Sequence, residues 1–223
     1  MVRGAFALAL AVSLTCCSTQ APTGPVLDVA TIKPRMPVGY CFLVTANGRE
    51  MPIMYQGEVG GRFKFETPPP LPLFAFDFNW DGLVSVEYPG GSVTFAPDDG
   101  SMNAQLAVGM KWTRKFDYQY GGHSLPCESR GAVRSYLPEH FAAGTFNAYL
   151  IQDSMSCLGG YLAAERTIYL APDALFPLMR VQTSSASTAG AQGDLRSWPL
   201  VPLNYEVKKF PPIIAERTKG RPT

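Results

Sequence analysis

Residues 110–120 alternate between large apolar and polar side chains. The apolar or aromatic members are Met110, Trp112, Phe116, Tyr118 and Tyr120, and the polar members are Lys111, Thr113, Lys115, Asp117 and Gln119. Because successive side chains of a β-strand point to opposite faces, this pattern predicts a strand with one buried and one solvated face. A register slip of one residue would bury the charges, so the pairing of this strand is well specified.

Shorter runs of the same kind recur along the chain, separated by Gly, Pro and Asn. They cover residues 40–45, 51–56, 62–67, 74–88, 132–141, 145–156, 165–170, 178–183 and 200–208. Asn47-Gly48 favours the positive φ angles of a type I′ turn and predicts a hairpin between the first two runs. No segment has a clear helical period. The sequence therefore predicts an all-β, mainly antiparallel fold: a single curved sheet, a half-barrel or an open barrel.

The composition agrees with a β-rich domain. Charged residues make up 17% of the chain, and 21 Gly and 20 Pro are present, whereas soluble domains average about a quarter charged residues. We expect one β domain over residues 38–210, large enough for a real core, and a fraying C-terminal tail over residues 211–223.

The first 17 residues have the order of a secretory signal. Arg3 precedes an apolar stretch over residues 5–14, which is too short to span a bilayer core that takes about 20 helical residues. Leu14-Thr15-Cys16-Cys17 then resembles a bacterial lipobox. The resemblance implies removal of a signal peptide, residues 1–16, and attachment of diacylglycerol and further acyl chains such as palmitate to Cys17. An ordinary secretory signal with a soluble periplasmic product is the alternative.

Residues 17–37 are expected to form the lipidated N-terminus and a flexible tether, because they are rich in proline and lack periodicity. Ser18 stands where lipoproteins retained in the inner membrane often have aspartate. The lipobox resemblance therefore implies a lipid anchor in the outer membrane, facing the periplasm. Acyl chains supply the membrane affinity, so the domain itself needs no membrane-binding surface.

Charge and cysteine content limit the function further. Without residues 1–16 the chain has 18 basic and 18 acidic residues, scattered along the sequence, so no electrostatic footprint for nucleic acid is present. Cys41, Cys127 and Cys157 would remain in an oxidising compartment, where a disulfide is the default. We favour a Cys127–Cys157 bridge because both cysteines flank the same central strand region, but three pairings are possible.

Motifs for chemistry are weak. Asp77, Asn79 and Asp81 match the opening of a calcium-binding EF-hand loop, but Tyr88 occupies the position of the bidentate acid and no flanking helix is expected. His123 and Cys127 could chelate a transition metal, yet structural zinc needs four ligands. No nucleophile elbow or phosphate loop is present. We expect no enzyme, no cofactor and no metal, with calcium binding as a minor alternative.

Three segments resemble the DUF3108-like and TapB-like family of bacterial envelope lipoproteins. They are Val108-Gly109-Met110-Lys111-Trp112, Phe141-Ala142-Ala143-Gly144-Thr145-Phe146 and Tyr169-Leu170-Ala171-Pro172. Ala142 stands where the family usually has proline. Together the segments fall within residues 108–180, about a third of the chain. The resemblance implies a fold similar to periplasmic lipoprotein carriers, but fold analogy alone does not confer function.

The aromatic residues suggest a binding function. Aromatic side chains usually fill β cores, but they could also line a concave cavity for an acyl chain or another hydrophobic envelope ligand. The candidate residues are Trp112, Phe116, Tyr118, Tyr120, Phe76 and Phe78. We therefore expect an envelope lipoprotein with a non-catalytic binding role. The alternative is a structural scaffold lipoprotein that docks on an envelope protein partner.

Overall fold

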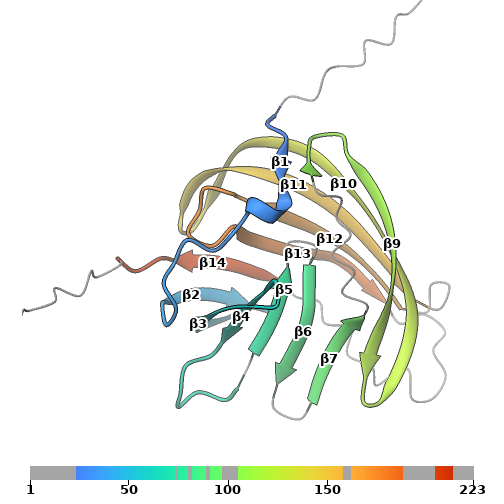
Figure 1. Cartoon of the computed structure of the whole chain (residues 1–223), viewed down its shortest axis with the longest axis horizontal. Helices are drawn as coiled ribbons and strands as arrows, with labels where there is room; N and C mark the ends of the chain where they lie inside the picture. Colours follow the sequence, from blue (N-terminus) through green and yellow to red (C-terminus); the bar gives the residue numbers. More distant parts are fainter. Residues whose placement is uncertain are drawn as a thin grey trace, which may run out of the picture.

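The computed structural model describes residues 24–73, 75–79, 82–88, 91–96, 105–157, 162–187 and 204–212. Within these ranges the chain consists of β-strands and one short 3-10 helix (Figure 1). The elements are β1 (Leu27–Asp28), η1 (Val29–Thr31), β2 (Cys41–Ala46), β3 (Arg49–Val59), β4 (Arg62–Glu66), β5 (Ala75–Asn79), β6 (Gly82–Tyr88), β7 (Gly91–Ala96), β8 (Gln105–Leu106), β9 (Lys111–Tyr120), β10 (His123–Phe141), β11 (Gly144–Cys157), β12 (Leu162–Leu170), β13 (Leu178–Ser187) and β14 (Tyr205–Lys209). No helix in the described ranges is long and apolar enough to cross a membrane.

All strand pairs of the main sheet are antiparallel. The hydrogen-bonded order is β10-β11-β12-β13-β14-β2-β3-β4-β5-β6-β7-β9, and β9 pairs in turn with β10. The predicted all-β, antiparallel and strongly curved single sheet is confirmed, and the pairing continues until the circuit closes. Its narrowest seam joins β13 to β14 through two residue pairs, Arg180 with Glu206 and Val181 with Tyr205. Figure 1 shows the long strands β9–β13 as one bent wall of the molecule.

Several strands match the alternation of the sequence. β9 occupies residues 111–120 as expected, and the hairpin of β2 and β3 turns at Asn47 and Gly48, whose φ angles are 48° and 79°. β10 differs, because it begins at His123 and not near residue 132. Gly, Pro and Ser in residues 123–131 hide the strand pattern, but this stretch pairs with β9 on one side and β11 on the other. Pairing with the two neighbouring strands therefore outweighs the low intrinsic β-strand propensity of residues 123–131.

The C-terminal part of the expected tether belongs to the domain. β1 pairs with β8, η1 follows directly, and Ile32 and Met36 are buried in the core at 3% and 6% exposure. The boundary expected at residue 38 therefore moves toward the N-terminus, because scattered apolar residues of this segment cover the core without any period. Residues 1–23, which contain the expected signal peptide and Cys17, lie outside the described residues, as do residues 213–223 of the expected tail.

Two apolar clusters fill the inside of the sheet. The larger cluster lies between the N-terminal segment, β2–β4 and the loop after β12, and includes Phe42, Phe65, Tyr149 and Phe176. The smaller cluster consists of Val93, Phe116, Tyr118, Leu125, Cys127, Met155, Cys157 and Ala164. On β11 the inward side chains run Ile151, Asp153, Met155, so a polar residue separates the two clusters.

Candidate functional site

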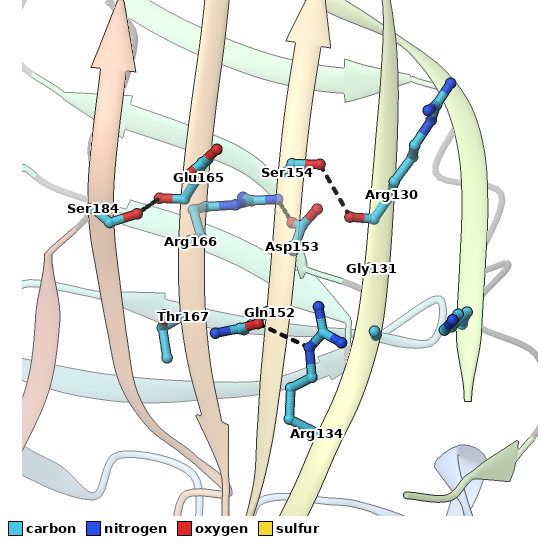
Figure 2. A pocket seen from close by; sticks show the side chains of 12 residues that line it. Arg130, Gly131, Arg134, Gln152, Asp153, Ser154, Glu165, Arg166, Thr167 and Ser184 are labelled. Atoms are coloured by element: carbon cyan, nitrogen blue, oxygen red, sulfur yellow. Dashed lines mark hydrogen bonds and ion pairs between the residues drawn. The ribbon is translucent and has the colours of Figure 1, made fainter. Parts of the chain in front are cut away.

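A polar hollow lies on the outer face of β9–β13 (Figure 2). Its volume is about 490 Å³, and we call it the groove. It is lined by Lys111, Arg130, Gly131, Ala132, Arg134, Gln152, Asp153, Ser154, Glu165, Arg166, Thr167 and Ser184. A second hollow of about 620 Å³ next to it shares Arg130 and Ser154 as lining residues. The two hollows therefore adjoin on one face of the sheet.

Small side chains and two β-bulges shape the groove. Ala132, Ser154 and Thr167 leave its floor low between long side chains. The β10–β11 register shifts between Val133 and Ser135, so Arg134 is the extra residue of a bulge. Ser184 is likewise the extra residue where the β12–β13 register shifts. Bulges bend a strand, increase its local twist and re-aim a side chain, and they occur often beside functional sites.

The charges around the groove are unevenly distributed. The Lys111 side chain makes no hydrogen bond or ion pair with the described residues, and Arg134 Nε donates to the neutral Gln152 Oε1 at 2.8 Å. Arg130 is already paired with Glu128 at 2.6 Å. Glu165 is exposed at the β12 side of the groove. The β9–β10 side therefore has uncompensated positive charge, and the β12 side has a carboxylate.

A buried ion pair underlies the groove on the inner face of the sheet. Asp153, with a side chain 5% exposed, pairs with Arg166 on the neighbouring strand and accepts a hydrogen bond from Ser129 Oγ at 2.6 Å. Breaking such a pair by removing one partner leaves a buried charge and costs about 3–5 kcal/mol. This arrangement fixes β10, β11 and β12 relative to one another below the groove floor.

The predicted ligand-binding aromatic residues fall into three groups. Phe116 and Tyr118 are 6% and 2% exposed and belong to the smaller apolar cluster. Trp112 and Tyr120 are half-buried on the same inner face of β9. Phe76 and Phe78 lie on β5, opposite Phe65 and Phe63 of β4, and their side chains lie outside the described part. The structure thus brings Phe116, Tyr118 and Tyr120 together with one cluster, while Trp112 packs against the other.

The predicted disulfide between Cys127 and Cys157 is confirmed. The two cysteines face each other in the β10–β11 ladder, and both are buried in the smaller apolar cluster. Cys127 is therefore no metal ligand beside His123, and Cys41 is a free thiol. Among the described residues, no group of three or more His, Cys, Asp or Glu side chains could hold a metal ion.

The segment with the calcium-like spacing forms a hairpin. Asp77 of β5 pairs with Ser85 of β6, and Asn79 pairs with Gly82. Asp81 lies outside the described residues. An antiparallel hairpin with its turn after Asn79 differs from the twelve-residue loop between two helices that an EF-hand requires.

Two of the segments behind the family resemblance meet at Arg180. Its guanidinium lies over the rings of Phe141 at 4.9 Å and Tyr169 at 5.2 Å, pairs with Glu206 at 2.9 Å and donates to the His140 carbonyl at 3.1 Å. Burial alone would raise the pKa of Glu206, but hydrogen bonds and charge from Lys208 and Arg180 outweigh it and lower that pKa. These residues form what we call the Arg180 cluster, which joins the β10–β11 hairpin to β12, β13 and β14.

Sequence reasoning missed the groove. The polar residues that alternate with apolar ones on β9–β12 suggested only a solvated outer face. One signal was present: Gln152, Ser154 and Ser156 place short uncharged side chains on the outer face of a strand where charged residues are common elsewhere. Neither bulge could be predicted from the sequence, because register shifts arise from the pairing of one strand with another.

Comparison with known proteins gives only weak structural similarity. The sequence matches no known protein-family profile, and no curated protein matches it. Among solved structures, the hypothetical lipoprotein YmcC from Escherichia coli aligns with a TM-score of 0.49 at 8% identity, covering 66% of this chain and 80% of that one. A candidate lipoprotein from Parabacteroides distasonis aligns with a TM-score of 0.36 at 8% identity, covering 80% of this chain and 97% of that one. Both are described as lipoproteins, and at these scores the similarity carries no argument about this chain.

Proposed function

We propose that this chain is a lipid-anchored envelope lipoprotein whose β domain has a non-catalytic binding role. The observation that carries the proposal is the combination of a sequence resembling a lipobox, ending at Cys17, with a buried disulfide, Cys127–Cys157, in the domain that follows. Disulfides form and persist in oxidising compartments such as the periplasm. A lipid anchor and a disulfide-bonded domain are consistent with one location, on the periplasmic side of the envelope.

The groove is the binding surface in this proposal. Its lining residues come from five neighbouring strands, β9–β13. The buried Asp153–Arg166 pair connects β11 to β12, and the disulfide connects β10 to β11. Sites built on strands are positioned more accurately than sites on loops. The lining is polar, so the corresponding partner is a polar segment of another envelope component.

The anchor is tested by the mass of the mature protein. The full chain is expressed in a bacterium that processes lipoproteins, extracted from membranes with detergent, and its N-terminal peptide is measured by mass spectrometry. We expect a peptide that begins with acylated Cys17, found in the outer-membrane fraction. Cys17→Ser should abolish acylation and Cys16→Ser should not. An intact leader, or a cleaved but unacylated N-terminus, would refute the proposal.

A hydrophobic ligand is the second candidate function. The favouring observation is that Trp112 and Tyr120 are half-buried on the inner face of β9, Trp112 against the larger apolar cluster and Tyr120 against the smaller one. An environment-sensitive naphthyl probe should then bind the purified domain and be displaced by a long-chain fatty acid. Trp112→Ala should weaken probe binding more than Leu137→Ala, which changes an exposed apolar residue of β10. Absence of displaceable binding would remove this candidate.

A further inference from the structure

The groove has opposite charges at its two ends. Lys111 of β9 and Arg134 of β10 have no carboxylate partner among the described residues, while Glu165 of β12 is exposed. A ligand that lies across the groove from β9 to β12 therefore contacts positive charge at its β9 end and negative charge at its β12 end. Charge complementarity favours a ligand with acidic groups at one end and a basic group at the other.

The groove has the length of a short peptide. It extends across five strands, from Lys111 on β9 to Ser184 on β13, and four strand spacings of about 4.8 Å correspond to about 19 Å. An extended chain covers this distance with about six residues at roughly 3.3 Å per residue.

The lining offers partners for peptide groups. Gln152, Ser154, Thr167 and Ser184 contribute an amide and three hydroxyls across the groove floor. Ser154 and Ser184 donate to the carbonyls of Arg130 and Glu165, so their oxygens stay available as acceptors. Strands β9–β13 are paired on both sides. A partner therefore cannot add as an edge strand and must be recognised by side chains.

A lipid surface fits the groove less well. None of the described residues that line it has an aromatic or large aliphatic side chain for an acyl chain to contact. Glu165 in the groove and Glu128 beside it would reduce the attraction of this face for an anionic bilayer. The polar lining and mixed charge favour a peptide over a membrane.

We propose that the groove binds an extended acidic peptide segment of an envelope protein, with its carboxylates between Arg134 and Lys111. This inference rests on the proposed binding role and adds the chemical class of the partner. The bulge at Arg134 directs its guanidinium onto the groove, where the Nε bond to Gln152 leaves the terminal nitrogens of Arg134 available for a carboxylate. Glu165 then forms an ion pair with a basic residue further along the bound peptide.

The test uses a fluorescein-labelled, end-blocked octapeptide with two aspartates at one end, one lysine at the other, and serine and glycine between them. Fluorescence anisotropy against the purified acylated protein in detergent should show saturable binding that weakens with salt. The double variant Lys111→Gln/Arg134→Gln should weaken binding about tenfold, because hydrogen bonds to charged groups are lost. Lys209→Gln, an exposed lysine on β14, is the matched control and should bind like the native protein.

Each alternative has its own outcome. Three results would overturn the inference. They are equal affinity for a peptide with lysines in place of the aspartates, no saturable binding up to millimolar peptide, and unchanged binding by the folded double variant. Binding only to phosphatidylglycerol vesicles would show that Lys111 and Arg134 bind a lipid headgroup. Full competition by inorganic phosphate would show that they bind a free anion. Either result would also overturn the inference. Circular dichroism confirms that the variants are folded. A crosslink from the groove to an envelope protein despite failed peptide binding would leave the binding role intact.

Discussion

Trp112 and Gly131 face each other across the β9–β10 ladder. A Cβ atom on Gly131 would lie 2.0 Å from Cζ2 of the Trp112 ring, so the indole lies directly over the glycine. We expect Gly131→Ala to destabilise the fold by about 1–3 kcal/mol, the usual cost of overpacking. Urea unfolding checks this value. In a Trp112→Leu background the same change should cost clearly less, and equal costs in both backgrounds would show that the ring is not the cause.

Tyr205 and Tyr149 differ in how their buried hydroxyls are bonded. The Tyr205 hydroxyl is buried without a partner among the described residues, and burial raises its pKa well above 10. The Tyr149 hydroxyl donates to the Pro25 carbonyl at 2.7 Å, and burial followed by the nearby Tyr136 raises its pKa to about 12.

Replacing each tyrosine by phenylalanine should therefore give opposite results. Tyr149→Phe loses a hydrogen bond and should cost about 0.5–1.5 kcal/mol, whereas Tyr205→Phe removes an unsatisfied polar group and should be neutral or stabilising. Chemical unfolding of the two variants side by side provides the measurement. A cost for Tyr205→Phe as large as that for Tyr149→Phe would mean that the Tyr205 hydroxyl is bonded in solution.

The Arg180 cluster connects elements that are far apart in the sequence. Folding lowers the pKa of Glu206 below its ordinary value of 4.5, so folding favours the ionised carboxylate. The resulting stability is complete above the unfolded-state pKa and is lost as the pH falls through the folded-state pKa. We expect the unfolding free energy to fall between about pH 5 and pH 3, and Glu206→Gln to reduce this slope. Arg180→Gln should reduce it similarly, and an unchanged slope in both variants would contradict the assignment.

The disulfide connects β10 and β11 at the end opposite their turn. It closes a loop with a sequence separation of 30 residues, which corresponds to about 3–4 kcal/mol in the chain-entropy description. We expect Cys127→Ala/Cys157→Ala to lower the unfolding free energy by about this amount under oxidising conditions. Cys41→Ala is the control and should leave it nearly unchanged. If reducing agent destabilises the double variant as much as the native protein, the bond lies elsewhere.

Strands with regular alternation could be predicted from the sequence, and strands held by pairing alone could not. β9 and the β2–β3 hairpin follow from alternation and from Asn47-Gly48. The first half of β10 was missed because Pro126, Ser129 and Gly131 conceal the pattern. β7 was missed as well, since it follows a Pro-Gly-Gly segment and has only two large apolar residues, Val93 and Phe95. The Cys127–Cys157 bridge was found because both cysteines flank one predicted strand pair.

At the scale of the whole molecule, the inner and outer faces of β9–β13 have different roles. The inner face packs two apolar clusters on either side of the buried Asp153–Arg166 pair. The outer face carries the groove, with two bulges and uncompensated positive charge. Changes in the groove are therefore expected to affect binding without unfolding the domain. The groove could not be predicted because it depends on the register of five strands. The alternating aromatic residues of β9, in contrast, can be recognised in the sequence of that single strand.

The most direct measurement is site-specific photo-crosslinking in intact cells from Thr167 in the groove and from Lys209 on β14 as the matched exposed position. A photoreactive residue at position 167 should form a discrete adduct with an envelope protein, and Lys111→Gln/Arg134→Gln should abolish it while the unfolding midpoint stays unchanged. No adduct from position 167, or the same adduct from both positions, would contradict the assignment of binding to this face.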